Sequence, residues 1–505
     1  MKKYLEKQGS LLWKEVLSHK LIYLILSLIL ILALAIRIYN TGTVLGFYYD
    51  QGRDALKIWN LLNKGDFFLL GPTTGIAGIF RGPYYYYLIT PFYWISRGDP
   101  VLPADFLAFT SVIAIAFLFY LGAKLLNRAT GIFAALIAGF SFNLMIASRW
   151  LSNPTPMLLL SVLLVWSLFL ISKGKRYFWV LVSFLAGLSL FHFGSSGEFF
   201  YFPAILIFAL WQRKYFPNAK IVFYSFLAFA FSLLPIFIFD LKNGFMLSKN
   251  IYAFIFEKES FSADILTVIE NRVSYITSTF YSLLFPISTK HTTLIFFFIG
   301  ICFVYFIPKF LKNNIAKIAI LLFLSPLMGI FFFHGNEGNI YGYYMTGYYL
   351  IFVLLVSLVL GLLWKKNAGK LIVIAFFYLF FNANLPLIKS KITDNADGPN
   401  TILLGNQKQA IEWIYKDADD EFNVDIFVPP VIPYSYDYLF TWYESMPDFS
   451  GKTEERRELL YTLYEEDPPY AERLEEWLVR QSGIGQVEYG EKFGGITVER
   501  RKRIK

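Results

Sequence analysis

The chain has 505 residues, of which 56% are hydrophobic and only 16% are charged, and its formal net charge is +9. A soluble globular protein averages about 25% charged residues, so this composition excludes a chain that is water-soluble over its whole length. A basic excess in a soluble protein would suggest nucleic acid. Here most Lys and Arg lie in short loops between apolar runs, a pattern that orients a membrane protein. We therefore expect a polytopic α-helical membrane protein that contacts membrane lipid and binds no nucleic acid.

Apolar runs of about 18 residues are long enough to cross roughly 30 Å of hydrocarbon. Lysines precede the first run and no small-residue cleavage site follows it, which predicts an uncleaved first span. The single cysteine, Cys302, excludes an internal disulfide and a cysteine-based zinc site. About eleven spans are predicted, at residues 20–39, 101–123, 130–147, 155–172, 177–192, 198–211, 219–239, 292–309, 315–334, 345–363 and 369–387.

Segment 82–96 is apolar and aromatic, but at about 15 residues it would reach only about 22 Å as a helix. If it lies on the membrane surface and the N-terminus is cytoplasmic, every loop placed inside is basic, as the positive-inside rule requires. Those loops are 124–128, 173–176, 212–220, 309–317 and 365–370. If 82–96 spanned the membrane, all of them would face outward. We therefore predict a surface helix there, with Tyr and Trp at headgroup depth.

This topology makes residues 42–100 one extracytoplasmic loop, in which apolar residues at helical spacing predict a second surface helix over 52–63. The other outer loops are 148–154, 193–197, 240–291 and 335–344. Residues 388–505 are charged and have no apolar run, which predicts a small extracytoplasmic α/β domain. Its expected elements are a helix at 406–416, a strand at 423–428 and an amphipathic helix at 470–480. The predicted division is 1–390 for the membrane domain and 391–505 for the second domain.

The first outer loop contains two acids that come directly after the first span. Asp50 precedes the predicted surface helix and Asp54 lies within its first turn, so both are expected at the membrane surface. An isolated Asp at a helix start more often only caps the helix. Two acids in the only long loop between the first two spans make a functional site the stronger interpretation.

Two motifs carry a family resemblance: Asp50-Gln51-Gly52-Arg53-Asp54-Ala55 and, after a gap, Phe80-Arg81-Gly82-Pro83-Tyr84-Tyr85-Tyr86-Tyr87. Together they resemble the opening loop of GT-C glycosyltransferases, in the family-39-like group of protein O-mannosyltransferases and lipid A aminoarabinose transferases. The likeness covers residues 20–390 in architecture, but in motif only 45–100 and, weakly, 148–154. It implies a GT-C-like fold and a hexosyltransferase that takes sugar from a polyprenyl-phosphate donor at the outer face of the plasma membrane.

The resemblance also implies roles for individual residues. The family's loop aspartate matches Asp50, whose carboxylate can take the proton of an attacking hydroxyl as general base. The leaving lipid phosphate needs fixed cations, and each candidate could instead reach toward lipid headgroups. The candidate cations are Arg53 and Arg81 of the first outer loop, Arg149 of the second, and Lys242 and Arg272 of the loop 240–291. Asp54 is expected to bind substrate beside Asp50.

The chain departs from the aminoarabinose transferases at two positions, where Arg81 and Asn153 stand in place of acidic residues. Their amino sugar is therefore not carried over, and a neutral hexose is expected, with Asn153 among its binding residues. The Tyr-rich stretches 84–87 and 341–349 are typical of interfacial belts. An aromatic face such as that of Tyr84 can nevertheless stack on a sugar ring, so Tyr84 is also a predicted substrate-binding residue.

Four ionisable residues lie at the outer ends of predicted spans, where such residues are functional candidates. His192 and Glu198 flank one short outer loop, and His334 and Glu337 lie in a later one. We expect them to hydrogen-bond sugar or phosphate. No firm cofactor is expected; a divalent cation stays open as an alternative because some GT-C enzymes bind one, yet these four residues have no recognisable ligand spacing.

Two other functions remain as alternatives. A transporter or flippase of a lipid-linked glycan would predict inverted repeats and broken helices with intramembrane charges, and the sequence shows neither. A noncatalytic envelope-assembly protein would not depend on Asp50. The C-terminal domain contains no nucleotide-binding glycine loop and no nucleophile triad, so we expect it to shape acceptor access or cover the catalytic loop. The acceptor, whether protein, lipid or glycan, is left open by the sequence.

Overall fold

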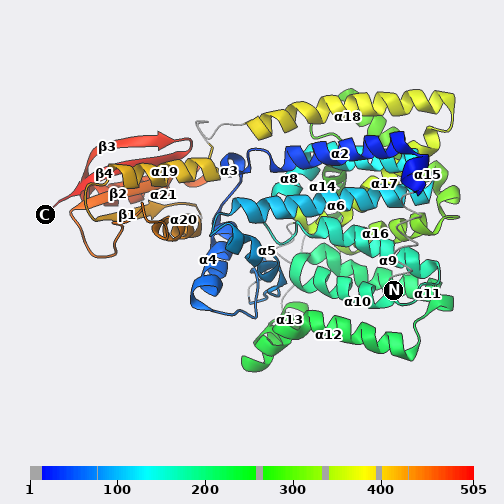
Figure 1. The fold of residues 1–505 in the computed structure, drawn as a ribbon, viewed down its shortest axis with the longest axis horizontal. Helices are drawn as coiled ribbons and strands as arrows, with labels where there is room; N and C mark the ends of the chain where they lie inside the picture. The colour runs from blue at the N-terminus through cyan, green and yellow to red at the C-terminus, as the bar shows by residue number, and fades with distance from the viewer. Residues whose placement is uncertain are drawn as a thin grey trace.

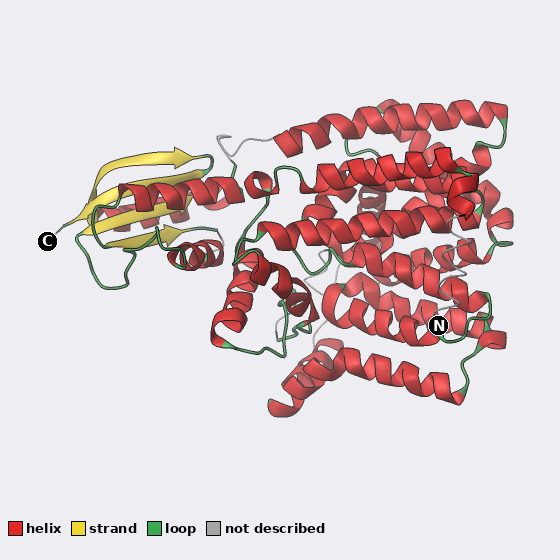
Figure 2. Ribbon diagram, in the orientation of Figure 1, coloured by secondary structure: helices red, strands yellow, loops and turns green. Residues whose placement is uncertain are grey.

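A bundle of long apolar helices makes up most of the molecule, and a small mixed domain sits at one end of it (Figure 1). The computed structural model describes residues 14–76, 78–256, 265–331, 340–393, 401–429 and 432–504. The described strands all lie in the small domain, which contains the C-terminus (Figure 2). The expected fold class, a polytopic helical protein with a small C-terminal α/β domain, is confirmed.

Each predicted span overlaps an apolar helix of the bundle. The helices are α2 (Lys20–Ile38), α6 (Val101–Leu125), α7 (Arg128–Phe140), α8 (Phe142–Arg149), α9 (Met157–Ser172), α10 (Phe178–Leu188) with the π-turn η1 (Ser189–Phe193), η2 (Ser196–Phe200), α11 (Tyr201–Trp211), η3 (Arg213–Tyr215), α12 (Ala219–Lys242), α15 (Lys290–Phe310), α16 (Asn314–Ile330), η5 (Gly342–Met345), α17 (Thr346–Leu363) and α18 (Asn367–Thr393).

Length and composition make six of the described helices able to cross a membrane, or seven if the pair α7–α8, bent by 62°, is one span. Four further apolar helices are shorter, so the count of eleven spans stays a prediction. Small residues let the helices approach closely: a Cβ added at Gly122 of α6 would lie 2.9 Å from the Cα of Gly131 in α7. Helix α17 is largely buried in the bundle, whereas α12 is exposed on its rim (Figure 1).

The loop between α2 and α6 contains α3 (Thr41–Val44), α4 (Tyr49–Lys64) and α5 (Tyr84–Ile95). The helices predicted over 52–63 and 82–96 are therefore present, as α4 and α5, while their place at the membrane surface remains a prediction. The loop 240–291, for which the sequence analysis predicted no helix, contains α13 (Met246–Phe256) and α14 (Ile265–Leu284). Their many polar residues gave no long apolar run that could have marked them.

The C-terminal domain consists of α19 (Leu404–Asp417), β1 (Phe422–Phe427), α20 (Tyr434–Glu444), β2 (Leu459–Glu465), η6 (Pro468–Tyr470), α21 (Ala471–Ser482), β3 (Gly485–Phe493) and β4 (Ile496–Arg503). The strand order is β1-β2-β4-β3, with β1 and β2 parallel and the other pairs antiparallel. The predicted helix at 406–416, strand at 423–428 and amphipathic helix at 470–480 match α19, β1 and α21. The predicted boundary at 390 falls inside the last turn of α18 and is not otherwise tested.

This domain packs on the first loop rather than on the bundle helices. The backbone N–H of Leu404 donates to Leu45 O at 2.9 Å, and Gln407 Nε2 donates to Phe47 O at 2.9 Å. Helix α20 packs along α4 so closely that a Cβ at Gly52 would overlap the backbone between Tyr434 and Ser435. Helix α4 is thereby fixed between α5 and α20, which sets the direction of every side chain that it carries.

Candidate active site

The N-terminal end of α4 presents Asp50 to solvent. Tyr48 caps the helix, with its backbone N–H donating to Gln51 Oε1 at 3.1 Å, and Gln51 Nε2 donates to Leu151 O at 3.2 Å. Asp50 lies in the first turn, where the helix dipole favours its negative charge. Its side chain is 58% exposed, so the carboxylate is open to an incoming substrate.

Arg53 bridges the two acids of this loop. Its Nη1 lies 2.8 Å from Asp50 Oδ1, and its Nη2 lies 2.7 Å from Asp54 Oδ1. Nη1 also donates to Thr73 Oγ1 at 2.9 Å, and the Tyr86 hydroxyl donates to Asp54 Oδ1 at 2.7 Å. Burial raises the pKa of Asp54 to about 6, although the Arg53 guanidinium and the Tyr86 hydroxyl favour its charged form. One guanidinium therefore orients an exposed acid and a buried one.

Arg81 comes from a hairpin-like turn that brings residue 81 back to residue 71. Gly71 N donates to Arg81 O at 2.8 Å, and Arg81 N donates to Pro72 O at 3.0 Å. Among the described residues the Arg81 guanidinium has no hydrogen-bond or ion-pair partner, and burial lowers its pKa. The Tyr343 phenol of η5 lies within electrostatic range of both Arg81 and Asp50. Arg53 contacts Thr73, which pairs with Phe80 next to Arg81, so the turn that carries Arg81 lies against the end of α4 that carries Asp50, Arg53 and Asp54.

His192 and Tyr84 are brought together as a structural pair. Their rings stack with centroids 4.3 Å apart. The Tyr84 backbone N–H donates to His192 Nδ1 at 3.3 Å, and His192 Nε2 lies 2.5 Å from Ser232 O. The Tyr84 hydroxyl donates to Phe231 O at 2.7 Å. A Cβ at Gly82 would overlap the imidazole ring. All polar atoms of this pair are occupied by the protein, so it joins the start of α5 to η1 and α12.

Glu198 is buried, and the described backbone uses both of its oxygens. Oε2 accepts from Ser195 N at 2.6 Å and Ser195 Oγ at 3.1 Å, and Oε1 accepts from Gly347 N at 3.0 Å. Asn153 is also buried, and its Nδ2 donates to Phe193 O at 3.1 Å. These two side chains tie neighbouring helix ends to one another. His334 and Glu337 lie outside the described residues.

Arg149 points into the fold and not toward Asp50. Its Nη1 donates to Ile36 O and Tyr39 O, both at 3.0 Å, at the C-terminal end of α2, where a cation is favourable. Lys242 is exposed at the end of α12 and Arg272 is buried in α14. The expected phosphate-binding cations are thus spread over the structure: Arg53 pairs with Asp50, and Arg81 has the Tyr343 phenol as a neighbour in common with Asp50.

The described residues do not fit a divalent cation. Across the described ranges, no group of three or more His, Cys, Asp or Glu side chains could hold a metal. Asp50 and Asp54 both direct a carboxylate oxygen at one guanidinium instead of at a shared position.

Two residues of the site escaped the sequence analysis. Tyr86 holds Asp54, and Tyr343 faces both Arg81 and Asp50. Both belong to Tyr-rich stretches that are typical of interfacial belts, so their composition hid them.

Comparisons with known proteins bear on the same region. The family model described as dolichyl-phosphate-mannose-protein mannosyltransferase matches residues 81–239. The match begins at Arg81 and so includes the second motif of the first loop except Phe80, but not Asp50. No curated protein sequence matches the chain.

Solved structures match nearly the whole chain. ArnT from Cupriavidus metallidurans in the apo state superposes with a TM-score of 0.59 at 8% identity, covering 96% of this chain and 98% of that one. The fold is that of GT-C glycosyltransferases. ArnT bound to undecaprenyl phosphate gives a TM-score of 0.57 at 9% identity, covering 95% and 98% of the two chains. The archaeal oligosaccharyltransferase AglB from Archaeoglobus fulgidus, with an inhibitory peptide and a dolichol-phosphate, gives 0.51 at 12% identity, covering 95% and 74%.

The resemblance to GT-C enzymes is thereby confirmed, and the family model and the GT-C fold together indicate a membrane glycosyltransferase. The fold places α4, α5 and the C-terminal domain at the same end of the bundle (Figure 1). Residues Asp50 to Arg81 therefore lie where the two parts of the GT-C fold meet.

Proposed function

We propose that this protein transfers a neutral hexose from a polyprenyl-phosphate donor to an acceptor hydroxyl at the outer face of the membrane. One observation carries the proposal: the exposed Asp50 carboxylate is oriented by Arg53, and the half-buried Arg81 of the same loop forms no ion pair with any described acid. Two proteins of similar fold have been solved with undecaprenyl phosphate and dolichol-phosphate, which supports a donor of this class.

In the proposed reaction the acceptor oxygen attacks the anomeric carbon while Asp50 takes the hydroxyl proton. The bond from the anomeric carbon to the phosphate oxygen breaks, and the electron pair leaves with the polyprenyl phosphate, so the configuration inverts. Asp50 suits this role because it is exposed and held in place by one charged hydrogen bond. The helix dipole and the Arg53 guanidinium both attract the negative charge of this carboxylate.

The two arginines of the loop have separate roles. Arg53 already faces two carboxylates, so its charge is compensated and it orients Asp50. Arg81 forms no ion pair among the described residues, although Glu198 lies within electrostatic range of it, and a fixed cation is what the developing charge on the leaving phosphate needs. Asp54, bound by Arg53 and Tyr86, positions Arg53 in turn.

Basic loops support the orientation that this reaction requires. With the N-terminus in the cytoplasm, the loops 124–128, 173–176 and 365–370 all face inward. The C-terminal domain, α4 and α5 then lie outside, with Asp50 at the level of the lipid phosphate. Labelling of single cysteines introduced in these loops would check the orientation.

The test is sugar transfer by membranes that contain the full chain. The membranes are incubated with a panel of radiolabelled polyprenyl-phosphate hexoses, and label leaving the lipid fraction is counted. Asp50→Asn should lower transfer by at least about 10²–10³-fold, since the base is lost while the helix start is kept. Asp66→Asn, an exposed acid just past α4, is the matched control and should transfer normally.

Two results of the same experiment would contradict the proposal. Normal transfer by Asp50→Asn would show that another group takes the proton. No release of label by the wild-type chain from any member of the panel would remove polyprenyl-phosphate hexoses as the donor class.

A further inference from the structure

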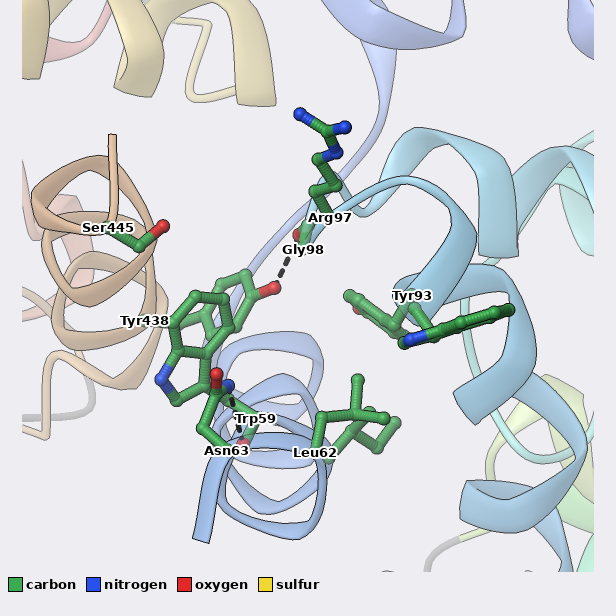
Figure 3. A pocket seen from close by; sticks show the side chains of 10 residues that line it. Trp59, Leu62, Asn63, Tyr93, Arg97, Gly98, Tyr438 and Ser445 are labelled. Atoms are coloured by element: carbon green, nitrogen blue, oxygen red, sulfur yellow. Dashed lines mark hydrogen bonds between the residues drawn. The ribbon is translucent and has the colours of Figure 1, made fainter. Parts of the chain in front are cut away.

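A cavity of about 370 Å³ lies at the opposite end of α4, between α4, α5 and α20 (Figure 3). It is lined by Ile58, Trp59, Leu62, Asn63, Tyr93, Trp94, Arg97, Gly98, Tyr438 and Ser445. Ile58 is about two turns, roughly 12 Å, beyond Asp50 along the helix. The cavity is therefore separate from the candidate active site, and its volume lies within the range of small-molecule sites, about 300–1,000 Å³.

Aromatic rings form both long sides of the cavity. Trp59 and Tyr438 lie on one side and Tyr93 on the other, with Leu62 below them in the view of Figure 3. A slot between aromatic faces favours a flat or chair-shaped ring that can pack on both walls. Trp94, with 68% of its surface exposed, lies where the slot opens outward.

The walls are fixed before any ligand enters. Trp442 Nε1 donates to Arg97 O at 2.9 Å, and the Tyr438 hydroxyl donates to Gly98 O. Gly98 has φ +99°, and a Cβ there would press on Trp59 and Trp442, so glycine is required at this corner. The turn after α5 is thus held by α20, which keeps the slot open between them.

Polar groups without protein partners face a ligand in this slot. Tyr93 is only 2% exposed, and its hydroxyl has no hydrogen-bond partner within the described ranges. Asn63 uses its Nδ2 on Trp59 O at 2.9 Å and leaves its amide oxygen free. Arg97 stands at the rim, with its side chain extending away from the slot (Figure 3). No acidic side chain lines the cavity.

These features point to a sugar ring. An apolar side chain would stack on the walls but would leave the Tyr93 hydroxyl buried without a partner, which is unfavourable. A sugar offers apolar C–H faces to the aromatic walls and hydroxyls to Tyr93 and Asn63. The absence of an acid among the lining residues disfavours a cationic amino sugar, and it leaves no negative charge in the cavity to repel a carboxylate on the ring.

We propose that this cavity binds a neutral or acidic saccharide ring of the acceptor, two helical turns from the carboxylate that activates the acceptor hydroxyl. The assignment of this ring to the acceptor rests on the proposed function, in which the donor sugar lies at Asp50. Binding of a saccharide in the cavity does not depend on that function. Helix α4 then fixes the distance between the reacting hydroxyl and the sugar unit bound in the cavity.

Binding to the full-length protein in lipid nanodiscs tests this directly. Methyl mannoside, methyl glucoside, glucuronate and glucosamine, together with their β-linked disaccharides, are titrated and followed by saturation-transfer NMR. Neutral and acidic sugars should bind and glucosamine should bind most weakly. Trp94→Ala and Asn63→Ala should each weaken binding by about tenfold, the loss of one stacking face or hydrogen bond. Lys64→Ala, exposed and next to Asn63 but outside the lining, should bind as wild type does.

Two results would overturn the site. One is a sugar affinity that neither variant changes, and the other is a saturation-transfer signal on lipid or peptide with none on any sugar. Asp50→Asn separates this proposal from the catalytic one. It should lose transfer and keep sugar affinity. If Asp50→Asn transfers normally while Trp94→Ala loses sugar binding, the catalytic assignment fails and the cavity stands; the opposite pattern removes the cavity alone.

Discussion

The two ends of helix α4 differ in almost every physical property. At the N-terminal end Asp50, Arg53 and Asp54 concentrate charge beside Arg81. At the C-terminal end aromatic rings enclose a cavity in which no side chain except Arg97 carries a charge. Charge is placed where the proposed reaction moves a proton and a phosphate, and stiff apolar surface is placed where a ligand would only be held.

Both ends depend on the C-terminal domain, but through different contacts. Tyr48, which caps α4, lies within electrostatic range of the buried Glu465 of β2. At the other end Tyr438 and Trp442 of α20 hold the turn at residues 97–98. The domain therefore has a positioning role at both sites, and changes at either end should report on one site without disturbing the other.

The largest effect is expected at Arg81. Arg81→Ala removes the cation that faces the leaving phosphate, so sugar transfer should fall by about 10²–10³-fold. Arg81→Lys keeps a charge without the planar guanidinium and should recover part of the rate. Transfer from labelled polyprenyl-phosphate hexoses measures both variants. Sugar binding at the far cavity should not change, and wild-type transfer by Arg81→Ala would assign the phosphate to another cation.

Arg53 should matter more for stability than any charged group at the other end. Arg53→Ala leaves the buried Asp54 without its cation, which should lower the free energy of unfolding by about 3–5 kcal/mol. Arg97→Asn at the cavity rim is the contrast: Asn tolerates the φ of +52° there, and the exposed side chain makes no ion pair within the described ranges. Its effect should stay within about 0.5 kcal/mol.

Thermal unfolding in detergent compares the two variants. The double variant Arg53→Ala with Asp54→Asn should recover much of the loss, because no uncompensated buried charge remains. Equal stability of Arg53→Ala and the wild type would mean that Asp54 is protonated at the pH of the measurement.

The sequence carried enough information for the elements near Asp50 but not for their partners. Asp50, Arg53 and Asp54 lie within about one helical turn, so helical spacing alone brings them together. His192 and Glu198 were also singled out, but their hydrogen-bond partners are Ser232 and Gly347, on other helices. Periodicity does not reveal contacts of that range, so side chains expected to bind substrate were not recognised as links between helices.

The cavity was beyond sequence reasoning for the same reason. Its walls come from α4, α5 and α20, and Trp59 and Tyr438 meet only because Gly52 lets the C-terminal domain approach α4. Helical spacing, by contrast, predicted the helix over 52–63, which is confirmed as α4, whereas the surface position that the basic loops predict for 82–96 stays a prediction. The sequence therefore predicted features that depend on neighbouring residues in the chain, but not features that depend on contact with another helix or strand.

Glu465 of β2, which lies near the Tyr48 cap of α4, should make the stability of the protein depend on pH. Burial raises the pKa of Glu465 to about 7, against the hydrogen bond from Tyr436, which favours the charged form. The folded protein thus binds this proton more tightly than the unfolded chain does. Stability should rise as pH falls through about 7 toward the ordinary pKa of 4.5, by on the order of 2 kcal/mol. Glu465→Gln should remove that dependence and be the more stable form above pH 7.

Thermal unfolding from pH 5 to pH 8 checks this prediction. Tyr436→Phe, which removes the hydrogen bond and keeps the burial, should steepen the pH dependence. An unchanged slope in Glu465→Gln would place the titrating group elsewhere.

The smallest effects are expected for the hydroxyls of Tyr438 and Tyr93, of which the first stabilises the cavity wall and the second is proposed to bind the ligand. The Tyr438 hydroxyl lines the cavity but donates to Gly98 O, so it is already used by the protein. Tyr438→Phe keeps the ring and should cost about 1 kcal/mol of stability, with sugar affinity changed less than about twofold. Tyr93→Phe is the matched change on the facing wall, where the hydroxyl has no partner in the described chain. It should leave stability nearly unchanged and weaken sugar binding by about tenfold. If the two variants behaved alike, the slot would recognise only the faces of the ring, and the hydroxyl-specific part of the cavity proposal would fall.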